Sequence, residues 1–133
     1  MNTNQKISPL AVLLIDDDDF SQQALSITLG LWGITDIEVA SSARTALKLL
    51  ERLQYTPDFL ICDIFMPDMD GIEFLMELRK RQYPGNIILV SGGNFDLLEM
   101  AQQLGLAGGL KVLGILTKPL FEEPLGALLG LTN

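Results

Sequence analysis

The stretch "LICDIFMPDMDG" (residues 60–71) ends an apolar run on an aspartate, and a proline, two more acids and a glycine follow it closely. An uninterrupted apolar run is typical of a β-strand that is covered on both faces. Proline, aspartate and glycine are typical of the turn that follows a strand. An unpaired charge is costly to bury, so Asp63 needs a reason to be there. We therefore predict a buried strand that presents Asp63 at its carboxyl end.

Four further apolar runs of β type lie on either side of this strand in the sequence. Helical patterns, with apolar residues three or four positions apart, separate the runs. Because strand and helix alternate five times, we predict an α/β fold with a parallel sheet and right-handed crossovers. The five predicted strands are "LAVLLI" (10–15), "IEVA" (37–40), "FLIC" (59–62), "NIILV" (86–90) and "LGILT" (113–117).

Recurring apolar residues predict the helices between these strands. We interpret Asp18 and Asp19 as the cap and first-turn acids of the first helix, and Phe20 and Trp32 as packing residues. A short last helix is expected at Pro124, because proline suits a first helical turn. The recurring residues are Phe20, Ala24, Ile27 and Leu31 in the first helix, Ala43, Leu47 and Leu50 in the second, Leu75 and Leu78 in the third, and Leu97, Met100, Ala101 and Leu104 in the fourth.

The composition of the chain excludes several classes of protein. The 133 residues, of which 48% are hydrophobic, favour one folded domain over residues 9–133 after a loose polar tail over residues 1–8. The net charge of −8 disfavours direct binding to nucleic acid or anionic lipid. No apolar run approaches a membrane span, we identify no signal peptide, and the single Cys62 favours the reducing cytoplasm. Because the sequence lacks histidine, a histidine base or metal ligand is excluded.

Polar side chains follow four of the five predicted strands. The first strand ends in "DDDD" (16–19), the third in Asp63, the fourth in "SGG" (91–93) and the fifth in "TKP" (117–119), whereas the second ends in the unremarkable "SS" (41–42). In parallel α/β sheets, ligands bind at the carboxyl ends of the strands. We therefore expect acids, a hydroxyl and a lysine to converge on one edge of the sheet.

The chemistry of this edge favours a hard cation and a phosphoryl group. Like charges at short range are costly, so Asp16, Asp17 and Asp63 would repel one another unless a cation were present, and carboxylate oxygens suit Mg²⁺. A carboxylate beside such an ion is a plausible phosphoryl acceptor. Ser91 and Lys118 can each bind a phosphoryl oxygen, and phosphoryl transfer depends on this kind of positioning and charge neutralisation.

The chain carries these residues in order along the sequence, each at a strand end. In this respect it resembles the receiver domain of two-component response regulators. The resemblance covers roughly residues 10–130, and Pro67 and Gly71 match the loop after the acceptor. It implies a doubly wound, five-stranded parallel sheet of order 2-1-3-4-5, the flavodoxin-like (βα)5 fold.

The resemblance also implies a role for each site residue. Asp63 resembles the phosphoacceptor, Ser91 the switch hydroxyl and Lys118 the lysine that pairs with the phosphoryl group. The implied Mg²⁺ ligands are Asp63, Asp17 as a direct ligand, Asp16 mainly through water, and the backbone carbonyl of Phe65.

The implied function is a phosphorylation-controlled switch of bacterial signalling. The phosphoryl donor is a sensor histidine kinase or a phosphotransfer protein, and the domain catalyses only its own phosphorylation and dephosphorylation. The receiver then controls an unknown output domain or protein, with a phosphorylation-dependent dimer among the expected assemblies. The chain is either a stand-alone receiver or a piece of a longer protein.

Two features depart from the usual pattern of the family. Ile115 stands three residues before the lysine, where the family often has an aromatic switch residue. The segment from Ser91 to Lys118 is also longer than usual, and its part "LGLAGGLKVLGILTKPL" (104–120) resembles receivers found with cyclic-di-GMP phosphodiesterase domains. We therefore expect the signal to pass through backbone shifts after Ser91, where two glycines leave the chain conformationally free.

Three other interpretations compete with this one. A calcium loop over residues 66–77 is disfavoured because Met66 offers no side-chain oxygen at its first position. An aspartate-nucleophile phosphohydrolase is disfavoured because Phe20 stands where that family has Thr or Val, and 133 residues leave no room for a cap domain. A pseudo-receiver, which binds partners without phosphorylation, remains the alternative that the acids and lysine argue against but do not exclude.

Overall fold

The computed structural model describes residues 10–65, 69, 71–93, 95–118 and 122–130. Within these residues, strands and helices alternate along the chain, five of each, as the apolar runs predict. In chain order they are β1 (Ala11–Ile15), α1 (Asp19–Leu31), β2 (Asp36–Ala40), α2 (Ala43–Arg52), β3 (Phe59–Asp63), α3 (Gly71–Lys80), β4 (Asn86–Ser91), α4 (Phe95–Ala107), β5 (Lys111–Thr117) and α5 (Glu122–Leu128).

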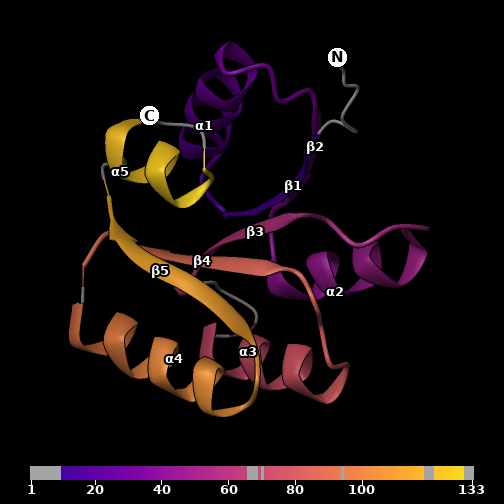
Figure 1. Ribbon diagram of the computed structural model, residues 1–133, viewed down its shortest axis with the longest axis vertical. Coiled ribbons are helices and arrows are strands. Elements are labelled where there is room, and N and C mark those ends of the chain that lie inside the picture. Colours follow the sequence, from indigo (N-terminus) through magenta and orange to yellow (C-terminus); the bar gives the residue numbers. More distant parts are fainter. Residues whose placement is uncertain (1–9, 66–68, 70, 94, 119–121, 131–133) are drawn as a thin grey trace.

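All five strands are parallel and lie in the order β2-β1-β3-β4-β5 (Figure 1). This order confirms the predicted doubly wound sheet. The third and fourth strands include one residue more than predicted, Asp63 and Ser91, and the fifth begins two residues earlier, at Lys111. Because β1 and β3 are neighbours in the sheet, the residues at their carboxyl ends lie side by side.

Helices cover both faces of the sheet (Figure 1), which explains why the strands are apolar without interruption. Side chains alternate between the two faces along each strand. In β1, Leu13 and Ile15 belong to the core beneath α2, α3 and α4, whereas Val12 and Leu14 belong to the core beneath α1 and α5. Cys62 lies in the first of these cores, as expected for a small buried residue.

The amino-terminal end of α1 is capped as the sequence predicts. Asp18 Oδ2 accepts a hydrogen bond from the backbone N–H of Ser21 at 2.8 Å, and this bond is the main reason why the pKa of Asp18 is lowered. Asp19 lies in the first turn, where a negative charge interacts favourably with the helix dipole. These two acids therefore serve the helix, which leaves Asp16 and Asp17 as the metal candidates of the acidic run.

Two large apolar residues at the ends of α1, Phe20 in its first turn and Trp32 directly after its last residue, lie in different environments. Trp32 is part-buried and packs on the core beneath α1 and α5, as predicted, but Phe20 is 78% exposed, so its interpretation as a packing residue is wrong. The helix packs on the sheet through its opposite side, which carries Leu25 and Leu29. Apolar residues recur at helical spacing on two sides of α1, and spacing alone does not identify the side that faces the sheet.

The last helix, α5, begins at Glu122, two residues before Pro124. Pro124 therefore lies within the first turn, the position that it was expected to suit. A proline is tolerated there because the first backbone N–H groups of a helix have no partner within it. The helix lies against β5, where a Cβ at Gly114 would come within 3.0 Å of Leu128 Cδ1. The glycine therefore lets the helix approach the strand closely.

Some predicted features lie outside the described residues, namely the tail over residues 1–8 and the loop residues Pro67, Asp68 and Asp70. In the part of the chain that is described, no helix combines the length and the hydropathy that crossing a bilayer requires.

Candidate functional site

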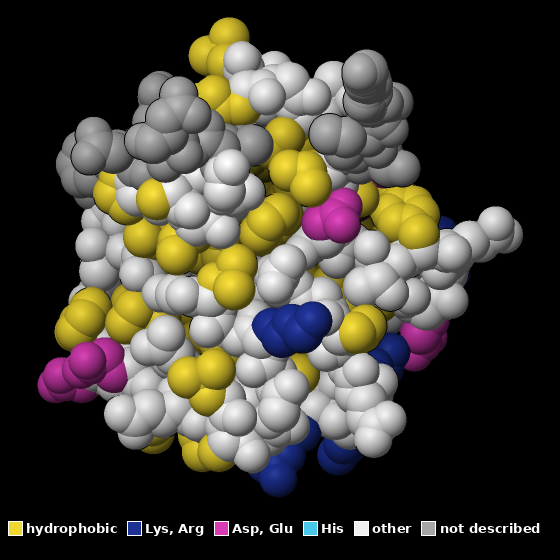
Figure 2. Space-filling view, in the orientation of Figure 1, with side chains coloured by type: hydrophobic (Ala, Val, Ile, Leu, Met, Phe, Trp, Pro, Cys, Tyr) yellow, Lys and Arg dark blue, Asp and Glu magenta, His cyan; other side chains and the backbone are white. Residues whose placement is uncertain are grey.

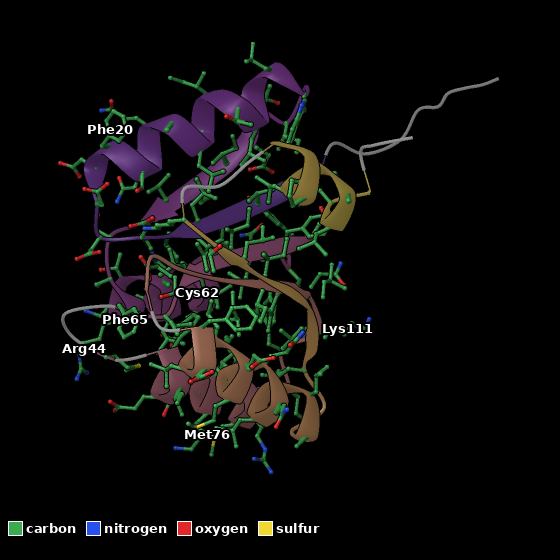
Figure 3. All side chains as sticks on the ribbon, turned by 90° about the vertical axis from the view of Figure 1, so that its left-hand side faces the viewer. Phe20, Arg44, Cys62, Phe65, Met76 and Lys111 are labelled. Carbon is green, nitrogen blue, oxygen red and sulfur yellow. The ribbon has the colours of Figure 1, made fainter. Side chains whose placement is uncertain are left out.

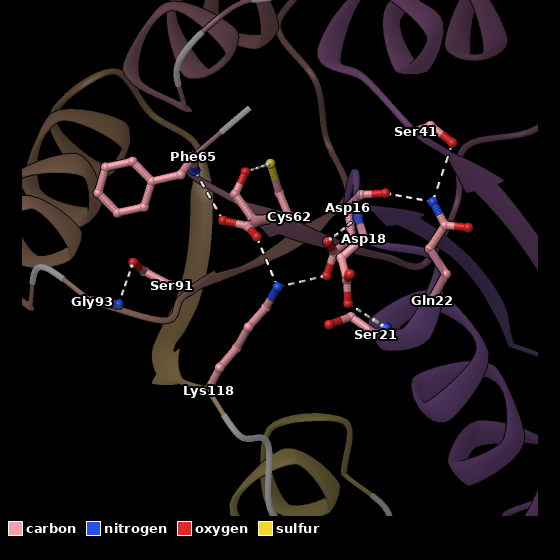
Figure 4. A network of polar contacts seen from close by, with 11 residues as sticks. Asp16, Asp18, Ser21, Gln22, Ser41, Cys62, Phe65, Ser91, Gly93 and Lys118 are labelled. Carbon is pink, nitrogen blue, oxygen red and sulfur yellow. Dashed lines mark hydrogen bonds and ion pairs between the residues drawn. The ribbon is translucent and has the colours of Figure 1, made fainter. Parts of the chain in front are cut away.

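The carboxyl edge of the sheet gathers the polar residues that end β3 and β4 and that follow β1 and β5 (Figure 4). Asp16 is 9% exposed, Asp63 is 7% exposed and Ser91 is fully buried. Within the described ranges, these three are the buried residues with polar or charged side chains. Asp17, in contrast, is exposed. Buried charges are rare in proteins unless they are paired, so this edge, with two buried carboxylates, differs from the apolar core.

Lys118 joins the two buried carboxylates. Its Nζ lies 2.9 Å from Asp16 Oδ2 and 2.8 Å from Asp63 Oδ2. Burial lowers the pKa of Lys118, but the hydrogen bonds and charges of the two aspartates outweigh burial, so the pKa is raised overall. The lysine is also fixed at its backbone, because its N–H donates to the carbonyl of Ser91 at 2.8 Å. A single positively charged group is therefore held between two acids.

The remaining oxygen of each buried carboxylate accepts a backbone hydrogen bond. The N–H of Asp18 donates to Asp16 Oδ1 at 3.0 Å, and the N–H of Phe65 donates to Asp63 Oδ1 at 2.9 Å. In both cases the donor lies two residues after the carboxylate, at the start of the loop. Each acid is thus oriented by its own loop on one side and by Lys118 on the other.

Three carboxylates of this edge are close enough to bind one metal ion. Asp16, Asp17 and Asp63 each offer an oxygen, and the three oxygens lie within 4.8 Å of one another. With Lys118, these groups carry a formal charge of three negatives and one positive, or −2, which a divalent cation balances. Hard oxygen donors without sulfur or imidazole fit Mg²⁺ better than a transition metal.

Ser91 lies at the same edge, but its hydroxyl is directed elsewhere. Ser91 Oγ accepts a hydrogen bond from the N–H of Gly93 at 3.2 Å, so it bonds to the loop that leads into α4 (Figure 4). The sequence therefore places the hydroxyl at the correct strand end, and the structure brings Asp16, Asp63 and Lys118 into contact. A hydroxyl that accepts one long hydrogen bond can rotate to another partner at small cost.

Gly71 closes the loop that follows Asp63. Its N–H donates to the carbonyl of Ile64 at 2.8 Å, and a Cβ at this position would lie 2.6 Å from Ile64 Cβ. No side chain fits at that distance, so the close approach requires glycine. The resemblance assigns Gly71 to this loop, and the contact supplies the physical reason.

Sequence reasoning missed Gln22, which lies in the first part of α1. Its Nε2 donates to the backbone carbonyl of Asp16 at 2.5 Å and to Ser41 Oγ at 3.2 Å. The side chain therefore joins α1 to the loops that follow β1 and β2. A glutamine near a helix start carries no sequence signal for this contact, and Ser41 appeared unremarkable for the same reason.

The chain is similar to known proteins in both sequence and structure. A family model described as the response regulator receiver domain matches residues 12–129. The chain is 30% identical over 115 residues to the chemotaxis protein CheY of Halobacterium salinarum, covering 85% of this chain and 87% of that protein. It also superposes on the crystal structure of a response regulator from Colwellia psychrerythraea with a TM-score of 0.78 and 32% identity, covering 93% of this chain and 97% of the other.

Other relatives are much longer than this chain. The regulatory protein AtoC of Escherichia coli is 36% identical over 80 residues, which are 60% of this chain but 17% of AtoC. The matched region is 35% of the probable C4-dicarboxylate response regulator DctR of Bacillus subtilis. The chain thus corresponds to one part of these proteins.

Proposed function

The chain belongs to the family of response regulator receiver domains, and from this premise we propose that Asp63 is the residue that accepts the phosphoryl group. Its role is that of the phosphoacceptor domain in two-component signalling. The observation that carries the assignment is the position of Asp63 at the end of β3, buried and 2.8 Å from Lys118. Asp16 and Asp17 lie beside it and complete an acidic site that suits a divalent cation.

We propose that Mg²⁺ binds at this cluster. Asp17 is the direct ligand, Asp16 acts mainly through water, and Asp63 and the carbonyl of Phe65 complete the set. The charge balance of three carboxylates against Lys118 supports this assignment. When bound, the ion neutralises negative charge between the acceptor carboxylate and the incoming phosphoryl oxygens.

The side chains then perform the transfer by position and charge. An oxygen of Asp63 forms a bond to phosphorus as the bond between phosphorus and the donor breaks, and the leaving group keeps that electron pair. The Nζ of Lys118 moves its hydrogen bond from Asp63 Oδ2 to a phosphoryl oxygen. The hydroxyl of Ser91 turns from the N–H of Gly93 and donates to a second phosphoryl oxygen.

The phosphoryl donor, the output that the domain controls and its cellular location are also proposals. We propose a phosphohistidine of a sensor kinase or phosphotransfer protein as donor, and an output domain or separate protein as the target of control. In this proposal the chain catalyses only its own phosphorylation and dephosphorylation. A single buried cysteine suits the cytoplasm, where thiols stay reduced. A link to cyclic-di-GMP phosphodiesterase domains and a phosphorylation-dependent dimer stay predictions.

Labelling with a small donor tests the assignment. Incubation with acetyl phosphate and Mg²⁺ should add the mass of one phosphoryl group, and hydroxylamine should remove it. Asp63→Asn should abolish the added mass, whereas Asp96→Asn, at an exposed aspartate in the first turn of α4, should retain it. Equal labelling of the Asp63→Asn variant would contradict the assignment, and a wild-type chain that never labels would favour the pseudo-receiver alternative.

A further inference from the structure

The side chain of Gln22 is directed from α1 toward the carboxyl edge of the sheet. Residues two positions apart on a helix point roughly 200° apart. Figure 3 shows Phe20, two residues before Gln22, on the side of α1 that faces away from the sheet. Gln22 is part-buried, whereas Phe20 is 78% exposed. A polar side chain that a helix turns inward needs hydrogen-bond partners, and those of Gln22 belong to the loops at this edge.

The side-chain amide of Gln22 joins two of these loops (Figure 4). Its Nε2 donates to the backbone carbonyl of Asp16 at 2.5 Å and to Ser41 Oγ at 3.2 Å. An amide nitrogen carries two hydrogens, so both of its donors are used. Ser41, directly after β2, thus fixes the amide on one side, and the amide holds the Asp16 carbonyl on the other.

The carboxylate of Asp17 is the least fixed of the three in the acidic cluster. Both oxygens of Asp16 and both oxygens of Asp63 accept hydrogen bonds, from backbone N–H groups and from Lys118. In the part of the chain that the structure describes, no hydrogen bond or ion pair holds the exposed carboxylate of Asp17. The direction of this side chain therefore depends on the backbone of its own loop.

The carbonyl that Gln22 holds belongs to the peptide group between Asp16 and Asp17. Asp16 lies one residue beyond β1, and its N–H bonds to the carbonyl of Ala40 at 3.1 Å. A small hollow between α1 and the sheet is lined in part by Asp16 and Gln22, so this peptide lacks close packing on that side. The hydrogen bond from Gln22 therefore sets the plane of the peptide, and with it the direction in which Asp17 leaves the backbone.

From these contacts we propose that Gln22 is a positioning residue of the metal site, which holds Asp17 in the direction that Mg²⁺ binding requires. The inference rests on the proposed function, in which Asp17 is the direct ligand. An oxygen of Asp17 lies within 4.8 Å of oxygens of Asp16 and Asp63, and the hydrogen bond from Gln22 keeps the loop in this arrangement. Residues that orient a metal ligand affect metal affinity without touching the ion.

The charges around α1 leave this task to a neutral donor. The helix contains no Lys or Arg, and the Lys and Arg side chains visible in Figure 2 lie below the region of α1 and α5. Lys118 is shared between Asp16 and Asp63. A basic side chain in place of Gln22 would compete with the ion for Asp17, and a glutamate would accept rather than donate. A glutamine orients the loop and leaves the negative charge of the cluster to the metal.

Titration calorimetry with Mg²⁺ alone tests the proposal on the unphosphorylated chain. Gln22→Met keeps the length of the side chain but removes the donor, so it should weaken Mg²⁺ binding about tenfold, as loss of a residue that orients a ligand does. Gln23→Met, at the exposed glutamine that follows, is the matched control and should bind as the wild type does. Thermal melting without Mg²⁺ shows that each variant is folded. Wild-type affinity in Gln22→Met overturns the proposal.

The same substitution in the Asp17→Ala background separates positioning from a general loss of structure. Because Gln22 acts through Asp17, Gln22→Met should change the Mg²⁺ affinity of that background by less than about twofold. A purely structural role would weaken binding equally with and without the Asp17 carboxylate, and equal losses in the two backgrounds therefore overturn the proposal.

Labelling with acetyl phosphate distinguishes this inference from the proposed function. In Gln22→Met the Mg²⁺ concentration for half-maximal labelling should rise about tenfold, while the rate at saturating Mg²⁺ stays within about twofold of the wild-type rate. A lower maximal rate with an unchanged Mg²⁺ requirement overturns the inference, because Gln22 would then act on the transfer itself. A wild-type chain that neither binds Mg²⁺ nor labels overturns the proposed function and this inference with it. If the wild type does both and Gln22→Met matches it, this inference alone fails.

Discussion

The two halves of the carboxyl edge are held very differently. At the ends of β1 and β3, Asp16 and Asp63 each accept a backbone hydrogen bond and share the charge of Lys118. At the end of β4, Ser91 accepts one hydrogen bond of 3.2 Å, from Gly93, in a loop that starts with two glycines. The acidic half is therefore assembled before any phosphoryl group arrives, whereas the Ser91 half must rearrange to bind one.

The largest expected effect comes from breaking the rigid half at Gly71. A methyl group there would lie 2.6 Å from Ile64 Cβ, so Gly71→Ala should lower the free energy of unfolding by about 2–4 kcal/mol. The matched variant on the other half is Gly93→Ala, which meets no atom within 4 Å and should change stability by less than about 0.5 kcal/mol. Urea unfolding measures both. Equal losses would mean that the two loops are held equally tightly.

The three carboxylates of the metal site all belong to the acidic half. Asp17→Ala should weaken Mg²⁺ binding on the order of 10–100-fold, since it removes one of three clustered carboxylates. Asp19→Ala, two residues away in the first turn of α1, should leave the affinity almost unchanged. Titration calorimetry distinguishes the two. Wild-type affinity in both variants would require the ion to bind elsewhere.

A phosphoryl mimic tests the half of the edge that lies at the end of β4. With beryllofluoride and Mg²⁺, amide exchange over residues 91–112 should change on the order of tenfold, because Ser91 must leave Gly93 to reach the mimic. Ile115 has neither a ring nor a hydroxyl, so Ile115→Tyr should not be needed for the response. The Asp63→Asn variant serves as the unliganded control. Changes confined to the acidic half would show that the domain stores a phosphoryl group without passing on a signal.

The smallest effect is expected at the opposite edge of the sheet. Burial raises the pKa of Tyr83, whose hydroxyl donates to the carbonyl of Pro57 at 3.0 Å. The folded state therefore keeps the neutral phenol, and its stabilisation is complete below the unfolded pKa of about 10 and is lost as the pH rises above it. Tyr83→Phe should cost about 1 kcal/mol at neutral pH and reduce this alkaline loss.

Unfolding followed at pH 7 and above pH 10 measures the effect. Tyr55→Phe is the comparison variant. Desolvation and the hydrogen bond to Asp36 also raise the pKa of Tyr55, but this side chain is 43% exposed, so the variant should keep most of the alkaline loss. An unchanged slope in Tyr83→Phe would mean that another group titrates there.

Much of the fold was predictable because strands and their ends follow simple rules. Apolar runs identified all five strands, and parallel pairing brings every carboxyl end to one edge. The placement of Asp16, Asp63 and Lys118 at one edge follows from that rule, whereas their direct contact also depends on the strand order, and their catalytic roles stay predictions. The strand order came from the resemblance, since apolar runs do not specify which strands are adjacent.

The features that sequence reasoning missed depend on how side chains and helices are oriented, which the residue types alone do not specify. Phe20 was assigned to the core because helical spacing identifies a stripe but not the side of the helix that meets the sheet. The contact of Gln22 with the Asp16 carbonyl requires two loops and a helix to be placed before it exists. The rotation of Ser91 toward Gly93 is likewise set by local loop geometry.

Locating the modified residue tests whether Asp63 is the phosphoacceptor. Borohydride reduces an aspartyl phosphate to homoserine, which peptide mass spectrometry can place after labelling with acetyl phosphate and Mg²⁺. The geometry predicts homoserine at position 63, where the buried carboxylate lies beside Lys118 and the other two acids. Homoserine at position 16 or 17 instead, with Asp63 intact, would contradict the account.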